Sequence, residues 1–248
     1  MKSAVVIEQG KRNYHMEDTY FLDLNFGKQG RWIVGGVYNG HRGEIAAQHL
    51  AKSFHGRFFY FLYRFPSIAD AFTNSYESIS EELNHQDSGS CAANFFIKNK
   101  KIHFANVGDV EIIILQKDTV CQLTTNHRLS NTKERDRIKE MGGEIHDNDP
   151  YVYRGANGLM PTRTIGDPCF KEVGIIARPT TGSHKISKND LFLITASDGL
   201  FDKLNKNEVA EIARKFKDPE KIAKALKEEV FNNHSAKDDL TIIVLSLN

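Results

Sequence analysis

The sequence predicts an α+β fold in which sheets pack against one another and helices cover them from outside. Strand-like apolar segments occur at the start, in the middle and at the end of the chain, so distant segments must meet in sheets. Two long stretches, 44–65 and 68–83, instead carry apolar residues at helical spacing. No repeat or convincing linker interrupts the 248 residues, so we expect one domain spanning residues 1–248.

The N-terminal third is predicted to hold three strands and two helices. The strand-like segments are residues 3–9, 19–24 and 31–38. The polar loop 10–18 separates the first two. Pro66 should end the helix over 44–65, because proline disrupts a helix interior, and Ser67 is a suitable N-cap for the helix over 68–83.

From Ser90 the pattern changes to short strands joined by tight polar turns, which predicts an antiparallel meander. Its strands are expected at residues 91–98, 101–107, 111–116 and 120–123. A short helix over 132–141 should end at Gly142-Gly143, since glycine commonly follows a helix C-terminus. Residues 147–158 are polar and rich in turn formers, so we expect a loop there.

The C-terminal part is predicted to alternate strands with helices. An almost wholly apolar strand covers 191–196, and a buried strand over 240–247 closes the chain. Between them, Asn205 and Glu208 have the spacing of a capping box at the start of a helix. Asp218-Pro219 marks a further helix start, because proline is favoured at the first helical position.

Composition argues against several classes of protein. Lys and Arg total 33 against 32 Asp and Glu, and this even balance disfavours nucleic acid or an anionic membrane as a partner. Three cysteines without paired spacing (Cys91, Cys121 and Cys169) indicate a reduced protein. The apolar run 4–7 is too short for a signal-peptide core, and no run approaches the roughly 18 residues of a membrane span. We therefore expect a soluble monomer in the cytoplasm or the nucleus.

The segment 33–43, I-V-G-G-V-Y-N-G-H-R-G, combines an apolar run with a polar turn that begins at Asn39. Gly40 and Gly43 lack a Cβ, so the backbone there can approach a ligand closely. The pattern predicts a strand that ends at a sheet edge, with His41 and the Gly40 carbonyl in the turn. Taken alone, the segment fits an ordinary strand-to-helix turn equally well.

Six acidic residues follow or flank short turns beside apolar strands: Glu17, Asp18, Asp109, Asp198, Asp202 and Asp238. A single Asp at a strand end often caps a turn. Six such residues in apolar surroundings could instead converge on a hard divalent cation, which takes oxygen ligands. The set predicts a metal site, in which we expect Asp198 and Asp238 to lie close together with no basic residue between them.

Short motifs succeed one another along nearly the whole chain. They are Gln9-Gly10-Lys11-Arg12 with Met16-Glu17-Asp18, residues 37–43, Ser88-Gly89-Ser90-Cys91-Ala92, Ala105-Asn106-Val107-Gly108-Asp109, Thr162-Arg163 with Ile165-Gly166-Asp167, residues 196–202, and Asp238-Asp239-Leu240-Thr241. In this order they resemble the motifs of the metal-dependent protein serine/threonine phosphatases of type 2C. Each motif is weak alone, but the shared order is strong evidence. The resemblance implies an α-β-β-α sandwich, in which two antiparallel sheets pack together with helices on both outer faces.

The resemblance also implies a mechanism. Members of that family use two divalent ions, usually Mn²⁺ or Mg²⁺, and a water between them that attacks phosphoserine or phosphothreonine in line. Carried over to this chain, Asp198 and Asp238 would hold one ion. Glu17 and the Gly40 carbonyl would help to hold the second, together with the residue at position 39.

Further roles follow from the same resemblance. Arg12 would bind the phosphate and His41 would protonate the leaving alkoxide. Asp109 and Asp202, together with Asp198, match a looser third metal site. Asp18 belongs to the opening motif without an assigned contact.

Several positions depart from the family pattern. The bridging aspartate is replaced by Asn39, which removes one negative charge and one bridging oxygen. Arg42 replaces a glycine and adds positive charge beside it. The interval from Arg12 to Glu17 is one residue longer than usual, and the flap at 148–157 is short. The second metal ion should therefore bind weakly.

Two interpretations remain. The chain is either an active phosphatase for phosphoproteins, in which Asn39 is tolerated or was introduced by engineering to trap a complex, or a pseudophosphatase. A pseudophosphatase would bind a phosphorylated or regulatory protein without turnover. Retention of the six acids and His41 favours the first, and loss of the ligand shared by both ions favours the second.

Overall fold

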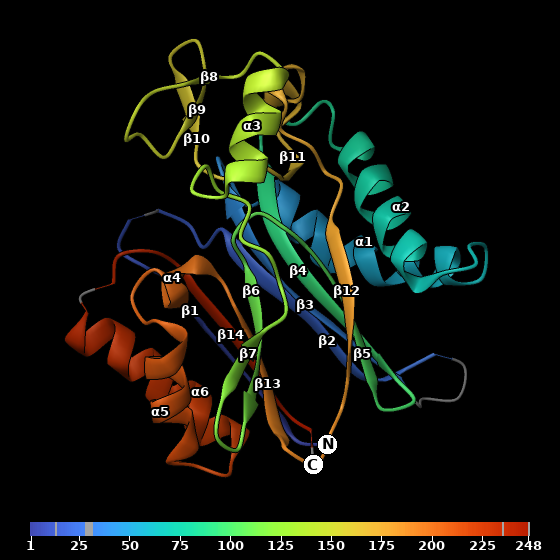
Figure 1. The fold of residues 1–248 in the computed structure, drawn as a ribbon, viewed down its shortest axis with the longest axis vertical. Coiled ribbons are helices and arrows are strands. Elements are labelled where there is room, and N and C mark those ends of the chain that lie inside the picture. The colour runs from blue at the N-terminus through green and yellow to red at the C-terminus, as the bar shows by residue number, and fades with distance from the viewer. Residues whose placement is uncertain (13, 28–31, 235, 248) are drawn as a thin grey trace.

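The structure, a computed structural model, describes residues 1–12, 14–27, 32–234 and 236–247. Two antiparallel sheets lie face to face, and helices cover the outer face of each (Figure 1). Apolar side chains of both sheets fill the space between them, among them Ile33, Val37, Phe95, Ile112, Leu193 and Ile243. The predicted α-β-β-α sandwich is therefore confirmed.

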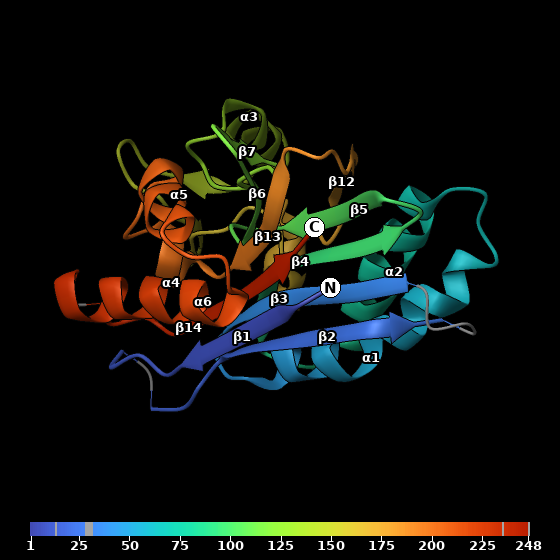
Figure 2. The same ribbon diagram turned by 90° about the horizontal axis from the view of Figure 1, so that it is seen from below.

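The first sheet joins the two ends of the chain. Its strand order is β1-β14-β13-β6-β7, with bounds Ser3–Glu8, Leu240–Ser246, Asp190–Ala196, Glu111–Gln116 and Val120–Gln122. The N-terminal strand pairs with the C-terminal strand, from Ser3 opposite Leu245 to Glu8 opposite Leu240. The view from below shows the two strands side by side (Figure 2).

The second sheet has the order β12-β5-β4-β3-β2, and the short strand β11 (Ile165–Gly166) also pairs with β4. The bounds are Thr180–Lys185, Lys101–Val107, Gly89–Lys98, Trp32–His41 and Asp18–Phe26. The third predicted strand began at Arg31, which lies outside the described residues.

The predicted meander is wrong in one respect, because its strands divide between the two sheets. Strands β4 and β5 belong to the second sheet, whereas β6 and β7 belong to the first. The chain crosses from one sheet to the other at Gly108, whose φ is +77°. A Cβ there would lie 2.1 Å from Cys91 Sγ, so only glycine fits this crossing.

The predicted turn at Asn39 is also wrong, since β3 continues through His41. Asn39, Gly40 and His41 pair with Cys91, Ser90 and Gly89 of β4, and this ladder keeps them extended. The turn begins at Arg42, three residues later than predicted, and Arg42 and Gly43 have φ of 56° and 103°. The side chains of the central segment are thus held by a strand within the sheet, which is stiffer than a loop.

Helices α1 (Ile45–Leu62) and α2 (Ile68–Glu82) cover the second sheet (Figure 1). Their buried aromatic rings stack on one another, and Phe54 contacts Phe58, Phe72 and Tyr76. Ser67 caps α2 as predicted, because its side chain accepts a hydrogen bond from the Asp70 amide at 3.0 Å. None of the helices in the described part of the chain has the length and apolar character needed to cross a bilayer.

Helices α5 (Lys206–Arg214) and α6 (Pro219–Glu228) cover the first sheet, preceded by the single turn α4 (Asp198–Phe201) and followed by η2 (Glu229–Asn233). The capping box of Asn205 and Glu208 forms as predicted. Asp218 caps α6 by accepting from the Glu220 amide at 3.1 Å.

A small layer lies beyond one end of the sandwich, at the top of Figure 1. It contains α3 (Thr132–Glu140), η1 (Pro168–Val173) and a sheet of order β10-β9-β8, with bounds Asn157–Leu159, Val152–Arg154 and Glu144–Ile145. The loop predicted over 147–158 is therefore partly a hairpin. Leu129, Ile138, Val152 and Phe170 form its own apolar cluster, which holds the hairpin in place.

Candidate active site

A cleft of about 420 Å³ opens where the two sheets meet the small layer. Among its lining residues are eight of the predicted site residues: Arg12, Glu17, Asn39, Gly40, His41, Asp109, Asp198 and Asp238. Tyr151 and residues 158–161 of the small layer line the cleft as well. Asp18 and Asp202 lie outside this lining.

Neighbouring strands bring Asp198 and Asp238 to the same edge of the first sheet. Asp198 follows β13 at the start of α4, and Asp238 precedes β14. The two connections are tied together, because Ser197 donates its amide to the Thr241 carbonyl at 3.1 Å and accepts the Thr241 amide on Oγ at 3.0 Å. The second sheet reaches the same point through Asn39, whose Nδ2 donates to Asp198 Oδ1 at 2.6 Å.

Gly40 is required by a close approach of two backbones. Its amide donates to the Glu17 carbonyl at 3.1 Å. A Cβ on Gly40 would lie 2.4 Å from that same oxygen, which no side chain can tolerate without a backbone shift. The Glu17 carboxylate in turn accepts the amide hydrogen of Gly43, so the turn after β3 orients it.

His41 is paired with a buried carboxylate. Its Nε2 lies 2.8 Å from Asp167 Oδ2, while Arg42 donates to the other oxygen of Asp167. Burial by itself would raise the pKa of Asp167, but the charge and hydrogen bond of His41 and the charge of Arg42 hold it well below its usual range. Arg42 also lies over the Phe170 ring, with 5.1 Å between its Cζ and the ring centroid. Asp167 therefore orients His41 but shares its charge with Arg42.

Arg12 binds the segment of the cleft that carries Asp238. Its Nη1 donates to Asp238 Oδ2 at 2.7 Å, and its backbone amide donates to the Lys237 carbonyl at 2.7 Å. Its side chain is still 65% exposed, so it can also reach a ligand in the cleft.

A second arginine, Arg128, contacts three of the predicted metal ligands. Its Nε donates to Asp109 at 2.7 Å, its Nη1 to Asp202 at 2.9 Å and its Nη2 to Asp198 at 3.2 Å. The expectation of acids without an intervening basic residue is therefore wrong: Arg12 binds Asp238, and Arg128 binds Asp198. Uncompensated carboxylates repel one another, and the fold supplies two guanidinium groups that reduce this repulsion.

The charge of the cluster is only partly balanced. Burial and the charges of Asp109, Asp202 and Asp238 together raise the pKa of Asp198 well above its usual range, and Arg128 opposes this rise. Asp198 and Asp238 line the same cleft. Four carboxylates against two guanidinium groups leave the ionised cluster with a negative formal charge.

The donor set has the chemistry of a site for Mn²⁺ or Mg²⁺, since carboxylate oxygens and a backbone carbonyl converge on one cleft. As arranged, however, no three His, Cys, Asp or Glu side chains of the described residues could hold a metal ion. The oxygens are engaged by the guanidinium groups of Arg12 and Arg128 and by the Asn39 amide.

Asp18 and Asp239 form a buried support beneath the cleft. Asp239 accepts the amide hydrogens of Gly10 and Glu17, each at 2.8 Å, and so fixes the segment that carries Arg12. Burial raises the pKa of Asp18 to about 7, although a hydrogen bond from Ser197 opposes the rise.

Residues 4–239 match the family model described as Protein phosphatase 2C. The chain belongs to the protein phosphatase 2C family. "Probable protein phosphatase 2C 59" of Arabidopsis thaliana is 32% identical over 248 residues, which cover 95% of this chain and 76% of that protein. "Protein phosphatase 2C homolog 1" of Saccharomyces cerevisiae is 28% identical over 255 residues, covering 94% and 88% of the two chains. The resemblance inferred from the motifs is confirmed.

Solved structures share the protein phosphatase 2C fold. A serine-threonine phosphatase 2C from Toxoplasma gondii superposes with a TM-score of 0.84 at 18% identity, over 98% of this chain and 94% of that one. A C. elegans sex determining protein superposes with a TM-score of 0.88 at 21% identity, over 99% of this chain and 64% of that one. Family membership associates the chain with Mn²⁺- or Mg²⁺-dependent dephosphorylation of serine and threonine residues in proteins.

Sequence reasoning missed four residues of this candidate site. Asp167 and Asp239 stood inside recognised motifs but carried no assigned role. Tyr151 was visible only as an aromatic residue in a polar stretch. Arg128 lies outside the motifs described above, and nothing in the local sequence distinguishes it from a surface arginine.

Proposed function

We propose that this chain is a protein phosphoserine/phosphothreonine phosphatase whose need for divalent metal is heightened by Asn39. The observation that supports this most strongly is the pairing of His41 with Asp167 in the same cleft as the acids and Arg12. A proton donor, a phosphate-binding cation and oxygen ligands from both sheets thus face one space.

The chain's own residues can perform two parts of the reaction. Arg12 is exposed and binds Asp238 through Nη1, so other N–H groups of its guanidinium can donate to a phosphate oxygen. Asp167 accepts a hydrogen bond from His41 Nε2, so the proton available for the leaving serine or threonine oxygen is the one on Nδ1.

A divalent ion, when bound, would supply an activated water and neutralise phosphate charge. We assign its ligands to Asp198, Asp238, Glu17 and the Gly40 carbonyl, with one oxygen from Asn39. The amide offers a single neutral oxygen and its nitrogen donates to Asp198, so it binds a cation less strongly than a carboxylate. The second ion is therefore expected to bind weakly.

A second candidate function is phosphoprotein binding without turnover. The engagement of the acids by Asn39, Arg12 and Arg128 favours it, because these groups offset part of the acids' negative charge and so weaken its repulsion of a phosphate in the absence of metal. In both functions the partner is a phosphorylated protein.

Phosphate release from a phosphothreonine peptide, measured while Mn²⁺ is raised from micromolar to millimolar, separates the two candidates. The phosphatase proposal predicts turnover that grows with Mn²⁺ into the millimolar range and falls sharply in His41→Ala. Peptide binding with no release at any Mn²⁺ concentration would contradict it and support the binding function.

A further inference from the structure

Arg128 holds a position between three carboxylates of the candidate metal site. Its guanidinium makes four hydrogen bonds: one to Asp109, one to Asp198 and two to Asp202, the last through Nη1 at 2.9 Å and Nη2 at 3.1 Å. The Arg128 side chain is only 18% exposed. A guanidinium is not deprotonated in proteins, so the group is always charged.

The backbone that carries Arg128 is fixed on both sides. The preceding residue, His127, donates its amide to the Gly108 carbonyl at 3.0 Å and accepts the Thr162 amide at 2.8 Å. Arg128 itself forms a β-bridge with Pro161, and its carbonyl accepts the Asn131 amide at 2.9 Å. The fold therefore holds the segment that places the guanidinium beside the acids.

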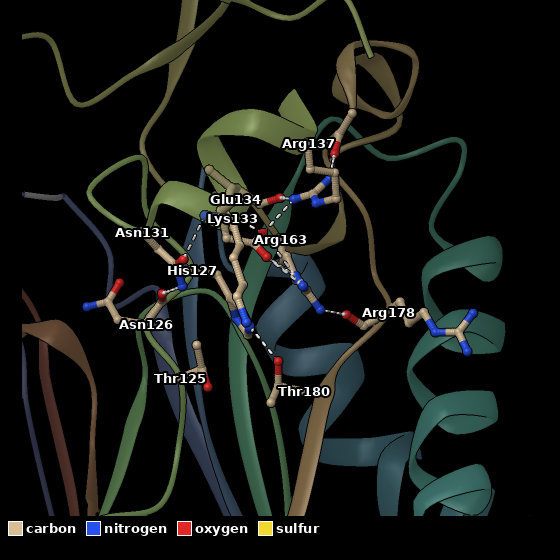
Figure 3. A network of polar contacts seen from close by, with 12 residues as sticks. Thr125, Asn126, His127, Asn131, Lys133, Glu134, Arg137, Arg163, Arg178 and Thr180 are labelled. Atoms are coloured by element: carbon tan, nitrogen blue, oxygen red, sulfur yellow. Dashed lines mark hydrogen bonds and ion pairs between the residues drawn. The ribbon is translucent and has the colours of Figure 1, made fainter. Parts of the chain in front are cut away.

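Side chains around this segment reinforce its position (Figure 3). The His127 ring lies 2.8 Å from Thr180 Oγ1, which ties the segment to β12. Glu134, at the start of α3, binds both Arg163 and Arg137. Burial would raise the pKa of Glu134, but hydrogen bonds from the two arginines lower it to about 2, so this anchor stays ionised.

The guanidinium and a divalent ion would compete for the same oxygens. Arginine has five N–H donors and no acceptor, so it cannot join a metal's ligand sphere. Two positive groups placed on one set of carboxylates also repel each other. An ion held by Asp109, Asp198 and Asp202 therefore requires Arg128 to leave.

We propose that Arg128 is a tethered counter-cation that occupies the Asp109–Asp198–Asp202 cluster and thereby raises the divalent-metal concentration that the chain needs. The metal can bind only those molecules in which Arg128 has left the three carboxylates. When these molecules are a fraction of the population, the apparent dissociation constant of the metal rises by the inverse of that fraction. Arg128 also keeps the acids folded together without metal. The inference uses the proposed function only in assuming a divalent ion as the ligand.

Calorimetric titration of the full chain with Mn²⁺ alone tests this. Arg128→Gln removes the charge and keeps a polar side chain, and we expect its Mn²⁺ dissociation constant to fall at least tenfold. Lys133→Gln is the matched control, because it removes an exposed positive charge five residues away, and its Mn²⁺ affinity should equal that of the parent. An Arg128→Gln chain that binds Mn²⁺ no more tightly than the parent overturns the proposal.

A double-variant cycle locates the gain in affinity. Asp202→Asn should leave Mn²⁺ affinity nearly unchanged in the parent, where Arg128 holds that carboxylate, and should remove the gain in Arg128→Gln. If Asp202→Asn changes Mn²⁺ affinity equally in the parent and in Arg128→Gln, Arg128 and Mn²⁺ do not compete for this cluster. If Arg128→Gln does not fold, Arg128→Lys is titrated with Mn²⁺ instead. A lysine ammonium cannot bind three carboxylates at once as the planar guanidinium does, so we expect a smaller increase in Mn²⁺ affinity. No increase would overturn the proposal.

These readouts are independent of catalysis. Tighter Mn²⁺ binding by Arg128→Gln together with no phosphate release would uphold the role of Arg128 and refute the phosphatase function.

Discussion

Acidification from pH 7.5 to pH 4 is expected to destabilise the fold through His127. This side chain is fully buried and its Nε2 lies 2.8 Å from Thr180 Oγ1. Burial lowers the pKa of His127 from 6.5 to about 4, helped by the charge of Arg163 and opposed by that of Glu134. The native state therefore keeps this imidazole neutral over a pH range in which the unfolded chain protonates it.

The sign and size follow from proton linkage. Between pH 6.5 and about 4 the unfolded state binds the extra proton, so the free energy of unfolding falls as the pH falls. The two pKa values differ by about 2.5, and each pH unit corresponds to roughly 1.4 kcal/mol, which gives a loss of about 3 kcal/mol. The loss should level off below about pH 4, where the native state is protonated as well.

Other buried groups titrate too, so the test is a difference between variants. Asp18, with its pKa raised to about 7, binds its proton in the native state first and stabilises the fold as the pH falls. Urea unfolding of the parent and of His127→Gln at several pH values from 7.5 to 4 isolates the His127 contribution. The exposed His85 supplies the control His85→Gln, which should follow the parent. Equal pH dependence in parent and His127→Gln would refute the reasoning.

Two further predictions concern the cleft. Mn²⁺ should raise the melting temperature of the parent and of His41→Ala but not of Asp198→Asn, because a ligand stabilises only the state that binds it. If Mn²⁺ leaves the melting temperature of the parent unchanged, the metal-site hypothesis is wrong. Gly40→Ala should cost about 1–3 kcal/mol in urea unfolding, because its Cβ would lie 2.4 Å from the Glu17 carbonyl oxygen. Gly56→Ala, in open space on α1, should instead stabilise by about 0.5–1 kcal/mol; similar losses in both glycine variants would show that the close approach is not the cause.

Local patterns predicted the elements well, because their causes are local. Helical spacing placed α1 and α2, and the Ser67 cap and the Asn205–Glu208 capping box lie within a few residues of the helices they start. The extent of β3 could not be predicted in this way. Asn39 and Gly40 have the composition of a turn, and they stay extended only because β4, some 50 residues away in sequence, supplies their partners.

The candidate site, too, could be predicted only in part. The acids were recognisable from short motifs, whereas their counter-ions were not, because the pairs are distant in sequence. Arg128 binds Asp109, Asp198 and Asp202 at separations of 19, 70 and 74 residues. Arg12 and Asp238 are separated by 226 residues. Only the packing of both sheets and the small layer determines which positive group meets which carboxylate.

The central claim is that Asn39 limits metal-dependent dephosphorylation, and Asn39→Asp tests it most directly. Phosphate release from a phosphothreonine peptide is compared in the parent and the variant at one Mn²⁺ concentration. The control for an added charge is Asn189→Asp, at the exposed residue directly before β13, at the end of that strand opposite Asp198. Restoring a charged oxygen beside Asp198 should raise turnover by at least ~100-fold, the scale of one preorganised electrostatic group. A variant as slow as the parent, or a gain shared by Asn189→Asp, would contradict the claim.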